Sequence, residues 1–139
     1  MNLPPPAPRP VTELPADILI TFEERRGYLY AQVAGPRDSR AISTAYWMRI
    51  AAQCEASRCR KLMVVENLGD YEGERDMADM VDAILAMGLG RLKVAFVTCR
   101  VQEMARLEHG EILAIERGAN GRVFGSTALA EHWLHHGGE

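Results

Sequence analysis

The sequence predicts a single α/β domain with a mostly parallel sheet of four or five strands and about four helices. Along the 139 residues, segments with the apolar spacing of helices alternate with short apolar segments typical of strands. An alternation of this kind requires crossover connections and therefore parallel strands. Two of the strand segments are continuous apolar runs, which suit the centre of a sheet whose two faces are covered by helices.

The first two strands are expected to form an antiparallel hairpin. Residues 18–23 and 28–34 have strand character and are separated by a turn at Arg26-Gly27. Two strand segments that are separated by a short gap containing glycine are typical of a hairpin. Gly35-Pro36 ends the second strand. We therefore expect one antiparallel pair at an edge of the sheet.

Helices and parallel strands then alternate to the end of the chain. Apolar residues at helical spacing predict helices over about residues 39–56, 77–85, 101–116 and 127–134. Strands are expected between them, at residues 62–65, 92–97 and 122–124. Asp38 or Ser39 can cap the first helix and Thr127 the last, because a short side-chain oxygen accepts a free N–H of the first turn.

Composition and missing motifs exclude several classes of protein. The net charge is −3 and no block of Lys and Arg stands apart, so neither nucleic acid nor an anionic membrane is an expected partner. No apolar run is long enough for a membrane span, and no signal peptide is evident. The glycine-rich turn of a dinucleotide-binding domain and the phosphate-binding loop of nucleotide hydrolases are both missing. No cofactor or metal is expected.

The three cysteines indicate a reducing compartment. Cys54, Cys59 and Cys99 are odd in number and irregularly spaced, which fits neither a disulfide framework nor a zinc site. We therefore expect reduced thiols and a cytoplasmic protein. His132, His135 and His136 share one face of the last predicted helix, and we interpret them as a solvated helix end rather than a metal site.

The chain is expected to divide into a tail and a domain. Residues 1–16 contain six of the seven prolines and are expected to be an extended tail, because proline fixes φ and cannot donate to a sheet. The tail could also bind a partner that recognises proline-rich segments. Residues 17–139 form the expected domain.

Several short motifs resemble the STAS/SpoIIAA-like family, which is related to bacterial anti-sigma-factor antagonists and the cytoplasmic tails of sulphate transporters. The motifs are residues 27–35, 61–67, 93–97, Arg122-Val123-Phe124 and the run Ala130-Glu131-His132-Trp133-Leu134. The resemblance spans about residues 18–135 and implies a domain of this fold. In some descriptions the group also resembles SEC14-type lipid-binding domains, which implies a small apolar ligand.

The resemblance also implies a serine phosphorylated in the loop after a central strand, but the matching loop contains none. Residues 66–76 hold no Ser or Thr, and residues 70–76 contain four Asp or Glu residues that would repel a phosphate. Asp70 or Asp76 could imitate a phosphoserine in charge only. The serine switch is therefore expected to be absent, which puts an anti-sigma partnership in doubt.

A binding site is expected where the central strands end, since ligands of parallel sheets lie beyond the carboxyl ends of the strands. Glu66 could be partly buried with a raised pKa, or could pair with Arg100 or accept loop N–H groups. The methionines of the following helix can pack in the core or adapt to an apolar partner. The expected site comprises Glu66, Asn67, Asp70, Tyr71, Met77, Met80, Thr98 and Arg100.

The leading hypothesis is a non-enzymatic, regulatory binding module. The segment of residues 67–80 would bind a protein partner or a small apolar, lipid-like ligand. The second hypothesis is a small enzyme that uses Glu66 and Cys99 at the strand ends, since a strand-end thiol near a helix start can have a lowered pKa. The third is a structural homodimer formed through the hairpin edge strand or a helix face.

Overall fold

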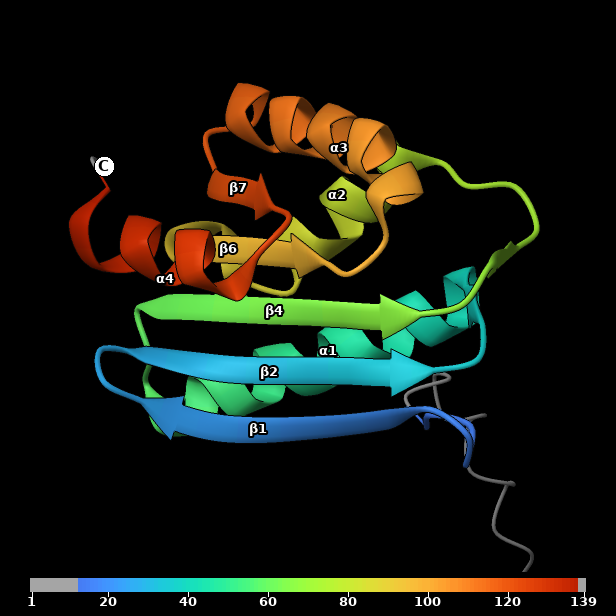
Figure 1. Ribbon diagram of the computed structural model, residues 1–139, viewed down its shortest axis with the longest axis horizontal. Coiled ribbons are helices and arrows are strands. Elements are labelled where there is room, and N and C mark those ends of the chain that lie inside the picture. Colours follow the sequence, from blue (N-terminus) through green and yellow to red (C-terminus); the bar gives the residue numbers. More distant parts are fainter. Residues whose placement is uncertain (1–12, 138–139) are drawn as a thin grey trace, which may run out of the picture.

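The computed structural model describes residues 13–137. Most of the proline-rich segment predicted over residues 1–16 therefore lies outside the described part. The main sheet has five strands in the order β1-β2-β4-β6-β7 (Figure 1). Their bounds are Leu19–Arg25 (β1), Tyr28–Gly35 (β2), Lys61–Leu68 (β4), Lys93–Thr98 (β6) and Asn120–Phe124 (β7).

The predicted hairpin and parallel sheet are both confirmed. β1 pairs antiparallel with β2, and all other neighbours in the main sheet are parallel. Two short strands were not predicted: β3 (Asp38–Ser39) and β5 (Tyr71–Glu72) pair in parallel beyond the ends of β2 and β4. Each long strand is joined to its short strand by only two residues, 36–37 after β2 and 69–70 after β4, and these connections bring the segments together.

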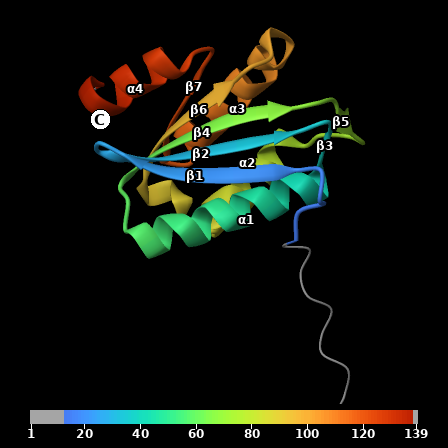
Figure 2. The ribbon, with the colours of Figure 1, turned by 60° about the horizontal axis from the view of Figure 1, so that its bottom comes forward.

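Four α-helices connect and cover the strands, as predicted. They are α1 (Arg40–Ser57), α2 (Met77–Ala86), α3 (Met104–Glu116) and α4 (Thr127–His136). Short 3₁₀ turns, η1 (Leu89–Arg91) and η2 (Val101–Glu103), precede β6 and α3. α1 and α2 lie on one face of the sheet and α4 crosses the other (Figure 2).

The helix caps show which of the two expected residues caps α1, and they show that the prediction for the cap of α4 is wrong. Ser39 caps α1 by accepting a hydrogen bond from the Ile42 N–H at 3.1 Å, which leaves the Asp38 carboxylate free for other partners. The cap of α4 is Ser126, not Thr127, because the Ser126 hydroxyl accepts the Leu129 N–H at 3.1 Å. Thr127 is the first residue inside that helix.

Alternation along β4 determines which side chains face α1. Leu62, Val64 and Leu68 belong to the core cluster under α1, whereas Met63 and Val65 belong to the cluster under α4. Because side chains of a strand alternate between faces, Glu66 shares the α1 face with the first set. A carboxylate is thereby placed at the end of an apolar row, under a helix.

None of the helices within residues 13–137 has both the length and the apolar composition that crossing a bilayer would require.

Candidate functional site

The carboxyl ends of β4 and β6 lie side by side, as the sequence predicts. Glu66 and Thr98 are register partners across the two strands. Both side chains are buried, with 8% of Glu66 exposed. The Tyr46 hydroxyl, from α1, donates a hydrogen bond to Glu66 Oε2 at 2.9 Å. The expected pairing of Glu66 with Arg100 is not found, because Arg100 instead donates to Asp70 at 2.7 Å.

A second carboxylate, Asp38, lies near the same strand ends. Its Oδ1 accepts hydrogen bonds from the Ser39 N–H at 2.7 Å and from the Ser43 hydroxyl at 2.9 Å. Its Oδ2 accepts one from the Arg75 guanidinium at 3.2 Å. Only 1% of Asp38 is exposed. We call Asp38, Ser43, Tyr46, Glu66 and Arg75 the polar cluster.

Arg75 connects the polar cluster to two further segments. Its guanidinium lies 3.7 Å from Glu103 Oε2, at the end of η2, and 3.8 Å from the centroid of the Tyr71 ring in β5. Glu103 also pairs with Arg106 on α3. One arginine therefore holds together the strand pair β3-β5 and the start of α3.

Burial in the polar cluster favours protonated carboxyl groups. Burial, and then the charge of Asp38, raise the pKa of Glu66 to about 7, although the Tyr46 hydroxyl and Arg75 act in the opposite direction. Burial likewise raises the pKa of Asp38, against hydrogen bonds from Ser43 and Ser39. The pKa of Tyr46 is also raised, by burial and by Glu66, so its hydroxyl remains a donor at neutral pH.

The raised pKa of Glu66 predicts a falling stability between about pH 4.5 and pH 7. In this interval the folded chain retains a proton that the unfolded chain releases, so unfolding becomes easier as pH rises. Glu66→Gln should flatten this slope, because the amide oxygen still accepts from Tyr46 and carries no charge. Urea unfolding of both proteins at intervals from pH 4.5 to pH 8 measures the effect. Parallel stability curves for the two proteins would contradict it.

Two neighbouring cavities lie on this side of the sheet. A small polar cavity of about 60 Å³ is lined by the polar cluster together with Tyr71, Arg106 and apolar side chains. An apolar pocket of about 130 Å³ lies between α2, α3 and the strands β6 and β7. Four side chains line both cavities: Trp47, Met77, Phe96 and Leu107.

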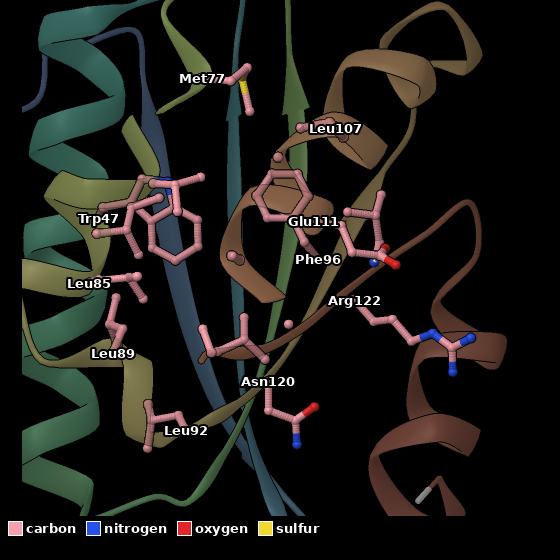
Figure 3. A pocket seen from close by; sticks show the side chains of 18 residues that line it. Trp47, Met77, Leu85, Leu89, Leu92, Phe96, Leu107, Glu111, Asn120 and Arg122 are labelled. Carbon is pink, nitrogen blue, oxygen red and sulfur yellow. Dashed lines mark hydrogen bonds between the residues drawn. The ribbon is translucent and has the colours of Figure 1, made fainter. Parts of the chain in front are cut away.

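The apolar pocket is lined almost entirely by carbon. α2 contributes Val81 and Leu85, and the stacked rings of Trp47 and Phe96 lie 6.0 Å apart between centroids (Figure 3). Asn120 and Arg122 of β7 line it too, and Figure 3 shows the Arg122 guanidinium turned away from the apolar side chains. Because so little of the exposed lining is polar, the pocket offers few groups to hold ordered water and suits an apolar occupant.

The structure brings only part of the expected site into one cavity. Glu66, Tyr71, Met77 and Met80 line the polar cavity. Thr98 is buried beside it and accepts a hydrogen bond from the Arg100 backbone N–H at 3.1 Å. The remaining side chains lie outside it: Asn67 and Asp70 are exposed, and Arg100 pairs with Asp70.

Cys99 does not join Glu66 in a cavity. The Cys99 N–H donates to the Glu66 carbonyl at 3.3 Å, but the thiol is exposed and does not line the polar cavity. Within residues 13–137, no three His, Cys, Asp or Glu side chains are grouped closely enough to bind a metal ion.

Sequence reasoning missed most of the polar cluster. Tyr46 lies among the buried, mostly apolar residues of α1, whose spacing predicts a helix and a core position, and the sequence around Asp38 indicates only a helix cap. Arg75 lies in a loop with no motif. One signal was available, since a tyrosine hydroxyl or a carboxylate on a buried face needs a hydrogen-bonding partner.

Together these features define a single α/β domain with a mixed sheet, a buried polar cluster at the strand ends and an apolar pocket beside it. Comparison with known proteins identifies no family, because no family model and no curated protein matches the chain.

Proposed function

We propose that this chain is a non-enzymatic, STAS-like binding module whose ligand is a small apolar molecule held between α2, α3 and the strands β6 and β7. The observation that carries the proposal is the apolar pocket of about 130 Å³. An engineered apolar cavity of about 150 Å³ binds benzene, so the pocket suits one aromatic ring or a short branched alkyl group.

Three further features support this proposal. The strand and helix order and the motifs of residues 27–35 and 122–134 resemble the STAS/SpoIIAA-like group, for which a regulatory role is typical. Met77 belongs to the segment of residues 67–80 expected to bind, and its flexible side chain lines the pocket. The carboxylates near the pocket are engaged by Tyr46, Ser43 and Arg75, which suits a structural role more than general acid–base catalysis.

Filling the pocket should abolish ligand binding. Ala114 of α3 lines the pocket, and Ala114→Leu adds three carbon atoms to its interior. Native mass spectrometry of protein purified from cells should show a bound small molecule in the natural chain. The bound fraction should fall at least tenfold in Ala114→Leu, because the occupant and the new side chain compete for one volume.

Ala105→Leu is the matched control. Ala105 lies on the same helix but is exposed and does not line the pocket, so this variant should retain the ligand. Equal loss in both variants, or equal retention, would contradict the proposed site.

A protein partner that inserts one apolar side chain into the pocket is the second candidate. Ile112 and Ile115, on the helix that lines the pocket, are each 55% exposed, which is typical of a contact surface. Protein that carries no small molecule, yet loses a co-purified partner in Ile112→Asp, would favour this candidate.

A further inference from the structure

Cys54 and Cys59 face each other across the end of α1. The helix ends at Ser57, and Arg58 adopts the left-handed conformation with φ 55° and ψ 34°. The Cys59 N–H then donates to the Cys54 carbonyl at 3.3 Å. These are the features of a Schellman motif, in which the residues joined by this outer hydrogen bond also bring their side chains into contact.

The two thiols lie against the same part of the core. Cys54 is 2% exposed and belongs to the core cluster under α1, and the half-buried Cys59 packs against that cluster. Burial, and then the interaction with the Cys59 thiol, raise the pKa of Cys54. A disulfide needs α-carbons about 4.4–6.8 Å apart, a separation compatible with a direct backbone hydrogen bond between the two residues.

Only one of the two thiols is within reach of a molecule in solution. Cys59 lines an open depression of about 180 Å³ near the start of the sheet, and the charged residues of its lining are Glu24, Arg25 and Arg60. Cys54 does not line it. Two guanidinium groups against one carboxylate give the depression a net positive charge, which attracts an anionic reactant, so it suits the approach of a negatively charged oxidant to Cys59.

We propose that Cys59 and Cys54 form a reversible dithiol–disulfide pair, oxidised by a small anionic disulfide. The Cys59 thiolate attacks one sulfur of the oxidant, so that a mixed disulfide forms and one oxidant thiolate leaves and takes up a proton. Cys54 then loses its proton and attacks the Cys59 sulfur, which releases the second thiolate. Two protein thiols are oxidised and one disulfide is reduced to two thiols.

In this order of steps Cys59 is the attacking thiol and Cys54 the resolving thiol. Burial of Cys54 prevents it from reacting first, while the Schellman motif holds it against Cys59 once the mixed disulfide has formed. The product joins the last turn of α1 to the residues that lead into β4. This pair is independent of the ligand pocket, whose lining contains neither cysteine.

The test exposes the folded full-length chain to excess oxidised glutathione and then digests it with trypsin under non-reducing conditions. Cleavage after Arg49, Arg58 and Arg60 separates Cys54 from Cys59, so residues 50–58 and 59–60 remain joined only through a disulfide. The expected result is this linked pair, lighter by two hydrogen atoms than the two separate peptides and carrying no glutathione. The Cys99→Ser variant should give the same result.

Single variants distinguish the order of the steps. Cys54→Ala should stop at one glutathione on Cys59, whereas Cys59→Ala should leave Cys54 unmodified. A natural chain that keeps both thiols free, retains glutathione on Cys59 or links either residue to Cys99 would overturn the proposal. Because the natural chain alone decides the question, poor folding of a variant does not affect the outcome.

Discussion

Replacing Gly69 with alanine is expected to lower the free energy of unfolding by about 4 kcal/mol. A β-carbon at this position would lie 1.9 Å from the Pro36 carbonyl oxygen and 2.5 Å from its carbon. Both are backbone atoms, so no side chain can rotate away. The chain would have to separate the end of β4 from the end of β2, where the Gly69 N–H donates to the Gly35 carbonyl at 3.1 Å.

Urea unfolding of Gly69→Ala against Gly125→Ala measures this effect. A β-carbon on Gly125 would meet only the end of the Met104 side chain, at 3.5 Å. The free energy of unfolding of that variant should therefore differ from that of the natural chain by no more than about 0.5 kcal/mol. Since Gly69 places β5 beside β3, its variant should also disturb the polar cluster. Equal free energies of unfolding for the two variants would show that the close approach of the Pro36 and Gly69 backbones is not needed for stability.

Replacing Arg75 with leucine is expected to lower the free energy of unfolding by about 3–5 kcal/mol, because it leaves Asp38 as an uncompensated buried charge. The side chains of Arg75 and Asp38 are 13% and 2% exposed, and the guanidinium also lies 3.7 Å from Glu103. The loss should be smaller at pH 5 than at pH 8, because burial raises the pKa of Asp38 and a protonated carboxyl needs no cation. Urea unfolding at both pH values measures it.

A surface ion pair provides the control. Arg40 of α1 pairs with Asp79 of α2, and both side chains are about half exposed. Arg40→Leu should therefore lower the free energy of unfolding by less than about 1 kcal/mol. Adding Asp38→Asn to Arg75→Leu should recover part of the lost stability. A loss for Arg75→Leu no larger than that for Arg40→Leu would show that the polar cluster does not hold these segments together.

The elements of the fold could be predicted because their signals are local. The apolar run at residues 62–65 and the turn at Arg26-Gly27 specify a buried strand and a hairpin without reference to distant residues. The strands β3 and β5 could not be found this way. Each has two residues. Their pairing depends on how the two-residue connections after β2 and β4 approach each other.

The candidate site was predicted only where it lies at strand ends. Glu66 and Thr98 could be placed there because the carboxyl ends of parallel strands meet at one edge. The partner of Glu66 is Tyr46, twenty positions earlier and on a helix whose apolar spacing indicates only core. The pocket was missed because it forms between α2, α3 and β7, and no single segment carries its pattern.

Titration with toluene, followed by nuclear magnetic resonance of the two tryptophan indole N–H signals, tests the proposed ligand pocket most directly. Trp47 lines the pocket, whereas Trp133 belongs to α4 and packs against the opposite face of the sheet. We expect the Trp47 signal to shift until it saturates while the Trp133 signal stays in place. A Trp47 signal that does not move, or two signals that move together without saturation, would contradict the assignment of this pocket as a binding site.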